Sequence, residues 1–112
     1  MEKRSSTLNV LLTRKANRDL KEIWQWNVQE FGEEHANRYL DFLLLHSMKL
    51  IVGEGRAVLG QNNLRYKIIR RNSSGHGHIA VYRVSESAAD LVRFFHTAQD
   101  WRNYFEKNEE SP

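Results

Sequence analysis

Arginine side chains are the groups in this sequence that could do chemistry on an anion. The candidates fall in the C-terminal half, among β-branched and aromatic residues, and one tyrosine accompanies them: Arg65, Arg70, Arg71, Tyr82, Arg83 and Arg93. On adjacent strands, guanidinium groups that gather on one face could hold a phosphate chain and stabilise charge in phosphoryl transfer without a metal. They could equally bind the acidic tail of a protein inhibitor, or only keep a solvent-facing surface hydrated.

Charge is distributed unevenly along the chain. The net charge is +3 at pH 7, yet the stretch from Arg56 to Arg83 contains six basic residues and no acidic one. The remaining residues are therefore net negative. A basic patch of this kind attracts an anionic partner, either nucleic acid or an acidic protein segment. The alternative is a sheet edge that carries charge to prevent aggregation.

Histidines supply the other candidate chemistry. His76 and His78 alternate along an extended segment, so both could face one side and share a metal. Two histidines without a third nearby ligand make a poor zinc site, and we expect no metal and no cofactor. His96 and Asp100 could pair as an acid–base group and the residue that orients it. The more ordinary expectation is that Asp100 lies at a helix start and that the pair ties this helix to the sheet.

The composition limits the classes of protein to which this chain could belong. With 112 residues it forms one domain. It has no cysteine, which excludes disulfide scaffolds, cysteine nucleophiles and thiolate metal sites and makes a reducing cytoplasm the expected compartment. No apolar run reaches the roughly 18 residues of a transmembrane helix, and the first residues lack the apolar core of a signal peptide.

Hydrophobic spacing predicts which elements position the candidate side chains. Apolar residues recur at three- and four-residue spacing in two segments that predict consecutive helices, the first capped by Thr13 and stopped by Gly32. Apolar stretches before and after this helical hairpin predict strands. The predicted elements are a strand at 8–12, helices at 14–31 and 34–52, strands at 64–71, 78–84 and 90–96, and a helix at 98–105.

This order, β-α-α-β-β-β-α, groups the helices together and the strands together. Such grouping favours an α+β fold in which an antiparallel sheet carries the helical hairpin on one face. We expect a single domain over residues 7–105, with polar, flexible tails at 1–6 and 106–112. Trp26 lies off the apolar stripe of the first helix, so it either contacts a partner or packs against the second helix.

Two sets of motifs span residues 8–104. The front half contains Ala16-x-x-Asp19-Leu20-x-x-Ile23-Trp24, Phe31-Gly32 and Ala36-x-x-Tyr39-x-x-x-Leu43. The back half contains Gly75-x-x-His78-Ile79-x-x-Tyr82-Arg83 and Arg93-Phe94-Phe95-His96-x-x-x-Asp100. In this order and spacing they resemble the ParE/RelE superfamily of toxins from bacterial toxin–antitoxin operons, and within it the ParE branch. The sequence departs from the family after the two helices, where Gly53-Glu54-Gly55-Arg56 replaces the usual proline and glycine.

The resemblance implies a RelE/ParE-like fold and a toxin that a ParD-like antitoxin, encoded beside it, neutralises. The ParE branch inhibits DNA gyrase by binding and traps its cleaved DNA intermediate, and membership of that branch would make this protein a binder and not an enzyme. The RelE branch instead cuts messenger RNA on the ribosome as a metal-independent endoribonuclease. A third hypothesis is a non-toxic module that kept the fold and the antitoxin but lost the activity.

Each hypothesis nominates its own residues. For binding to gyrase or to the antitoxin, the expected residues are Trp26, Arg65, Lys67, Arg70, Arg71, Tyr82, Arg83 and Arg93. For RNA cleavage, the expected residues are Arg65, Arg83, Arg93 and His96. We expect Arg83→Glu and Arg93→Glu each to weaken toxicity while leaving the fold intact.

Overall fold

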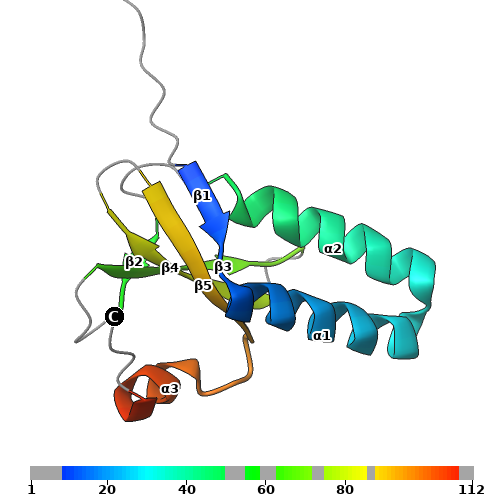
Figure 1. The fold of residues 1–112 in the computed structure, drawn as a ribbon. Coiled ribbons are helices and arrows are strands. Elements are labelled where there is room, and N and C mark those ends of the chain that lie inside the picture. Colours follow the sequence, from blue (N-terminus) through cyan, green and yellow to red (C-terminus); the bar gives the residue numbers. More distant parts are fainter. Residues whose placement is uncertain (1–8, 50–54, 59–62, 72–74, 86–87, 109–112) are drawn as a thin grey trace, which may run out of the picture.

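The computed structural model describes residues 9–49, 55–58, 63–71, 75–85 and 88–108. Its elements are β1 (Asn9–Leu12), α1 (Arg14–Phe31), α2 (Glu33–Ser47), β2 (Arg56–Ala57), β3 (Leu64–Ile69), β4 (His78–Val84), β5 (Ala88–His96) and α3 (Trp101–Asn108). The predicted α+β class, with a helical hairpin packed on a sheet, is confirmed (Figure 1). Residues 1–6 and 109–112 of the expected tails lie outside the described residues, whereas 106–108 continue α3.

The first helix begins and ends where the sequence predicts. The hydroxyl oxygen of Thr13 accepts the N–H of Ala16 at 3.2 Å and so satisfies one of the unpaired donors at the start of α1. At the other end, Gly32 has φ 93°, a backbone conformation that residues with a Cβ rarely adopt. Its N–H donates to the carbonyl of Val28 at 2.9 Å. The reversal at Gly32 places α2 antiparallel to α1 (Figure 1).

The second helix ends at Ser47, earlier than the predicted end at residue 52. Tyr82 donates its hydroxyl proton to the Ser47 carbonyl at 2.8 Å, and the Lys67 ammonium donates to the His46 carbonyl at 3.1 Å. Carbonyls in the last turn of a helix have no partner within it, so side chains from the sheet satisfy this helix end. The apolar pattern that continued to Ile51 overestimated the helix, and residues 50–52 of that prediction lie outside the described ranges.

Five strands form one sheet in the order β1-β5-β4-β3-β2. The first strand runs parallel to β5, and the other neighbouring pairs are antiparallel. β4 has the predicted bounds, β3 ends earlier than predicted, and the short strand β2 was not predicted. In the β4–β5 pair, Val81 lies opposite Arg93 and Tyr82 opposite Leu91, so Val92 is an extra residue in a β-bulge.

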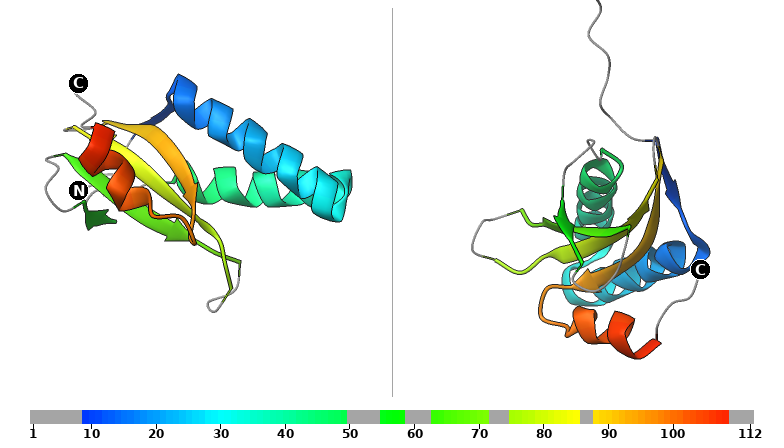
Figure 2. Two further views of the ribbon diagram at one scale, coloured as in Figure 1. Left: turned by 90° about the horizontal axis from the view of Figure 1, so that it is seen from below. Right: turned by 90° about the vertical axis from the view of Figure 1, so that its left-hand side faces the viewer.

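Helices cover both faces of this sheet (Figure 2). The hairpin covers one face, where Leu20, Leu43, Tyr82 and Leu91 are among the residues of a buried cluster. The last helix covers part of the opposite face and buries Trp101 and Phe105 against the sheet, in a second cluster. Because side chains alternate along a strand, each central strand contributes to both clusters.

Candidate functional site

A cleft of about 850 Å³ opens between the helical hairpin and one end of the sheet. Its walls come from α1, α2, the segment after β3, the start of β4 and the end of β5. Of the five histidines in the chain, four line this cleft: His35, His76, His78 and His96. We call this cavity the histidine cleft.

A tyrosine–histidine pair lies in the wall of the histidine cleft. Tyr39 Oη is 2.6 Å from His78 Nδ1. Burial raises the pKa of Tyr39 to about 12, although the nearby charge of Arg71 acts in the opposite direction. Burial, with a contribution from His96, lowers the pKa of His78 to about 4. Both side chains are therefore neutral at pH 7, and the phenol, which is the better donor, gives its proton to Nδ1.

His96 contacts the other two histidines at this end of the sheet. Its ring centroid is 5.3 Å from that of His76 and 5.5 Å from that of His78. Burial lowers the pKa of His96, and His76 lowers it further. The Nδ1 atom of His96 accepts the backbone N–H of Ala98 at 3.0 Å, within the turn that leads into α3. That nitrogen is thus held by the backbone of this turn and not by the predicted partner Asp100.

Three of the predicted binding residues, Trp26, Arg71 and Arg93, line the histidine cleft. The Arg71 guanidinium lies over the rings of Tyr39 and Phe42, at 5.5 and 5.4 Å from their centroids. Trp26 is 55% exposed, and its ring meets that of Phe31 in a T-shaped contact at 5.8 Å. Trp26 is therefore not a core residue, and it contributes an exposed aromatic side chain to the cleft.

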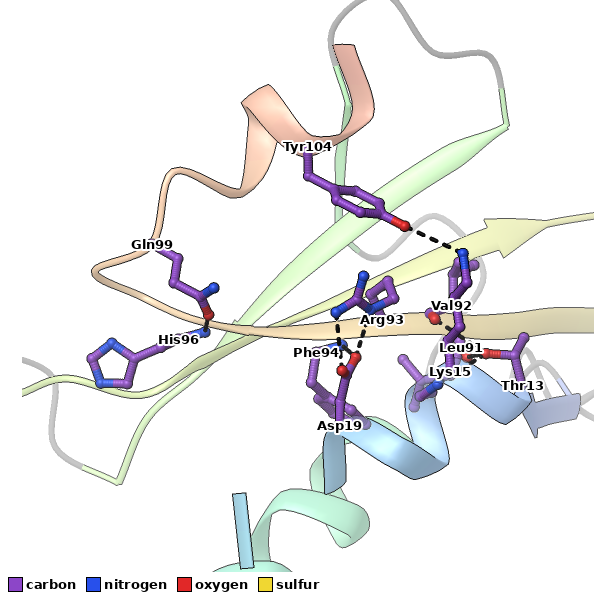
Figure 3. Close-up of polar contacts among 11 residues, drawn as sticks. Thr13, Lys15, Asp19, Leu91, Val92, Arg93, Phe94, His96, Gln99 and Tyr104 are labelled. Atoms are coloured by element: carbon purple, nitrogen blue, oxygen red, sulfur yellow. Dashed lines mark hydrogen bonds and ion pairs between the residues drawn. The ribbon is translucent and has the colours of Figure 1, made fainter. Parts of the chain in front are cut away.

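Arg93 forms an ion pair with Asp19 of α1 (Figure 3). Its Nε donates to Oδ2 at 2.7 Å and its Nη2 donates to Oδ1 at 3.0 Å, a bidentate geometry. The backbone N–H of Phe94 donates to the same Oδ2 at 2.9 Å. The guanidinium also lies over the ring of Tyr104 at 4.9 Å. The hydrogen bond that Arg93 donates to Asp19 raises the pKa of Arg93, so this charge stabilises the fold.

The sequence allows the basic residues to gather on one face of the sheet, but the structure places them on both faces. Arg65 and Lys67 lie opposite Tyr82 and Ala80 and share their face, the one under the hairpin. Arg83 lies opposite Leu64 and is on the α3 face. Since adjacent residues of a strand point to opposite faces, Tyr82 and Arg83 could not both belong to a single binding surface.

Several nominated side chains are held by contacts within the protein. The Arg65 guanidinium donates to the Gly55 carbonyl at 3.0 Å, and Lys67 donates to carbonyls at the end of α2. Tyr82 is fully buried and bonded to Ser47, so its nomination as a contact residue is corrected to a core role. Arg70 is exposed just after β3.

Asp19 and Tyr39 are the important side chains that sequence reasoning left without a role. Both stood in the quoted motifs, but neither was nominated for a site. Asp19 interrupts the apolar face that Ala16 and Leu20 define on α1, and it is buried there. A carboxylate at such a position needs a partner, and this signal could have pointed to Arg93.

The described part of the chain contains no group of three or more histidines, cysteines and carboxylates placed to hold a metal ion. Within the same residues, no helix has the length and apolar character needed to cross a membrane. The histidine cleft offers imidazoles, one guanidinium outside the ion pair and aromatic rings, which suit hydrogen bonding and stacking.

Comparison with known proteins agrees with the fold and the motifs. Residues 10–101 match the model of the family described as "ParE toxin of type II toxin-antitoxin system, parDE". A search of curated protein sequences finds no significant match. Among solved structures, one from P. aeruginosa described as a chromosomal ParDE toxin–antitoxin system is similar, with TM-score 0.65 and 19% identity over 81% of this chain and 97% of that one. Because the family model spans most of the domain, the chain belongs to the ParE toxin family of type II toxin–antitoxin systems.

Proposed function

We propose that this ParE-family toxin inhibits DNA gyrase by binding to it in the cytoplasm, and that a ParD-like antitoxin neutralises it. The family provides the expectation of gyrase as target. The observation that favours binding over RNA cleavage is the dispersal of the residues nominated for catalysis.

Those residues surround no common point in the described structure. Arg65 and Arg83 lie near the end of β4, whereas His96 pairs with His78 at its start. From His78 to Tyr82, the residue opposite Arg65, four residues of extended strand span about 13 Å, and Arg83 is one residue farther away. Arg93 is bonded to Asp19. Metal-independent cleavage needs an acid–base group and several cations around one phosphate, and these four side chains do not supply that arrangement.

Arg83 is the nominated residue best placed to contact gyrase. It is partly exposed on the α3 face of the sheet, opposite Asp90 of β5. Among the described residues, no hydrogen bond or ion pair within 4.0 Å holds its guanidinium. A cation of this kind contributes association rate and specificity at a protein interface.

A second groove suits the antitoxin. It has a volume of about 400 Å³ and lies between α1 and α2, beside the end of β1. Its lining is mostly apolar and includes Leu20, Trp24, Leu40 and Leu44, with Lys21 as its one charged residue. An amphipathic antitoxin segment could bury its apolar side chains here, and its acidic residues would meet the basic groups of the toxin.

The test is a supercoiling assay with purified gyrase, plasmid DNA and the purified toxin. We expect inhibited supercoiling and accumulation of linear DNA, both reversed by the antitoxin. Arg83→Glu should weaken inhibition at least about tenfold, since it reverses a charge at the proposed interface. Arg18→Glu, a charge reversal at an exposed position of α1, should leave inhibition unchanged.

Other outcomes identify the alternatives. A chain that is toxic in cells but has no effect on gyrase would exclude the proposal, and cleavage of messenger RNA on ribosomes would then be measured. A folded chain that binds the antitoxin but is not toxic would be the non-toxic module.

A further inference from the structure

The histidine cleft has hydrogen-bond donors that the proposed function does not use. His96 Nδ1 accepts the N–H of Ala98, and His78 Nδ1 accepts the hydroxyl proton of Tyr39. Thr97 Oγ1 accepts the N–H of Gly77 at 3.2 Å and lies 3.4 Å from His76 Nδ1, to which it can give its own proton. A neutral imidazole whose Nδ1 accepts carries its proton on Nε2. The His78 and His96 rings are therefore N–H donors even when uncharged, and the exposed His76 ring adds a third donor in the tautomer in which Thr97 donates to its Nδ1.

These Nε2 atoms are accessible to a ligand. Within the described residues, none of the three Nε2 atoms makes a hydrogen bond. In the same residues, every buried side-chain nitrogen or oxygen of a residue that is not itself exposed has a hydrogen-bond partner. The Nε2 atoms of His78 and His96, which are partly buried residues, must therefore reach solvent. His76 is an exposed residue. Because all three rings line the cleft, their donors serve one cavity.

The same cleft carries a cation and exposed aromatic rings. Arg71 lies over Tyr39 and contributes the one guanidinium of the cleft that is not in the Asp19 ion pair. Trp26 and Phe31 are 55% and 57% exposed, and both line the cavity. Donors and a cation favour an anion, and exposed rings favour a flat group beside it.

Negative charge in the cleft is limited to two carboxylates. Asp19 is neutralised by its bidentate contact with Arg93. Glu22 is exposed on α1, with no recorded ion pair among the described residues. An anion could therefore enter without facing a buried, uncompensated carboxylate.

We propose that the histidine cleft binds a nucleotide, with its phosphate on the imidazole donors and Arg71 and its base against the aromatic rings of Trp26 and Phe31. The ligand is either a unit of single-stranded nucleic acid or a free nucleotide, which share this chemistry. A volume of about 850 Å³ is sufficient for one nucleotide. The aromatic rings favour a nucleotide over an acidic peptide, because a base stacks on them and a carboxylate does not. This inference is independent of gyrase inhibition.

The test is fluorescence anisotropy of a fluorescein-labelled pentanucleotide, oligo(dA), titrated with the full-length toxin. We expect saturable binding with a log–log salt slope of about −0.7 to −1.4, which corresponds to one or two phosphates. AMP, inorganic phosphate and a pentaglutamate peptide serve as competitors. Displacement by AMP identifies a nucleotide site, whereas binding of the oligonucleotide without displacement by AMP identifies a site for single strands. Both results support the proposal.

Comparing the oligonucleotide affinity of variants inside and outside the cleft shows whether binding takes place in the cleft or elsewhere on the surface. Arg71→Gln should weaken binding about fivefold or more, because it removes the positive charge that attracts the phosphate, and His76→Ala should weaken it because it removes the imidazole altogether. The control is His46→Gln, since His46 is exposed and is the one histidine outside the cleft. Glu22→Gln should tighten binding, a direction that partial unfolding could not produce.

Two results would overturn the proposal. The first is no saturable binding by protein that is folded by circular dichroism. The second is displacement by pentaglutamate at the concentration at which AMP acts, with equal affinity in the Arg71→Gln and His46→Gln variants. That result would leave only non-specific charge attraction. Neither result bears on gyrase inhibition, which is measured with Arg83→Glu.

Discussion

The Asp19 carboxylate accepts a backbone hydrogen bond from β5 at a point where β1 no longer pairs with that strand. The first strand pairs with β5 only as far as Leu91, and α1 begins at that point. The backbone N–H of Thr13 then donates to the Leu91 carbonyl at 3.1 Å, and Asp19 accepts the N–H of Phe94 at 2.9 Å. Since the same carboxylate holds Arg93, one side chain joins α1 to the open edge of β5 (Figure 3).

Replacing Asp19 with alanine should lower the free energy of unfolding by about 3 kcal/mol, because it leaves a half-buried guanidinium and a backbone donor without their acceptor. Urea unfolding at pH 7 measures this loss. The control is Glu34→Ala, which breaks the exposed Glu34–Arg38 pair and should cost about 0.5 kcal/mol or less. Equal losses in the two variants would show that the Asp19 contact contributes no more than a surface ion pair.

The same contact changes the expected result for Arg93→Glu. A glutamate at this position would face the carboxylate of Asp19, so the variant should be destabilised and should not keep the fold intact. Loss of toxicity in Arg93→Glu would therefore say nothing about a binding surface. Arg83→Glu remains the informative substitution, since no recorded contact among the described residues depends on that guanidinium.

His78 should make the protein less stable in acid. Its pKa lies at about 4 in the folded protein against an ordinary value of 6.5, so between these values the unfolded chain binds a proton that the folded one does not. The stabilisation is complete above about pH 6.5 and is lost as the pH falls toward 4, by up to about 3 kcal/mol.

Urea unfolding at pH 7 and pH 5 measures this loss, and His78→Gln should lose less between the two values than the unaltered protein. Some loss should remain in the variant, because the pKa of His96 is lowered as well and has the same sign of effect. An identical loss in both proteins would rule out His78 as the source.

At the scale of elements, local patterns predicted the helix ends that neighbouring residues determine better than the ends that depend on distant residues. Thr13 and Gly32 act on their own neighbours, so the sequence located both ends of α1. The end of α2 depends on Tyr82 and Lys67, which are distant in sequence. The start of α3 is delayed to Trp101, because Gln99 turns back and its side chain accepts the N–H of His96 at 2.7 Å. The two-residue strand β2 is too short to give a periodic signal.

Tyr82 tests whether the α2 end depends on the sheet. Tyr82→Phe removes the hydroxyl that donates to the Ser47 carbonyl, and in this buried site the loss should be about 1 to 3 kcal/mol of unfolding free energy. Amide hydrogen exchange should increase most in the last turn of α2. Gyrase inhibition per folded molecule should stay constant, because a buried ring does not contact a partner. A specific loss of inhibition at unchanged stability would restore Tyr82 to the binding surface.

Over the whole molecule, the candidate site depends on how the hairpin is set against the sheet. Trp26 and Arg71 were nominated from sequence, yet nothing in their local patterns placed them in one cavity with Tyr39 and His35. That juxtaposition follows from the packing of α1 and α2 on one face, a long-range property. The α+β class needed only the order of elements, and for that reason it could be predicted.

Replacing a phenylalanine with alanine should have different effects on stability and on ligand binding at the α3 end and at the hairpin end of the molecule. Phe105 of α3 is 1% exposed and packs on the rings of Phe95 and Trp101, whereas Phe31 at the hairpin end is 57% exposed. Phe105→Ala should therefore cost about 3 to 5 kcal/mol of unfolding free energy, because it leaves a cavity between α3 and the sheet. Phe31→Ala should cost less than about 1 kcal/mol and should instead weaken oligonucleotide binding at least about fivefold, since it removes a stacking surface. Urea unfolding and anisotropy on both variants separate the roles. A large stability loss in Phe31→Ala would mean that this ring supports the hairpin and is not held open for a ligand.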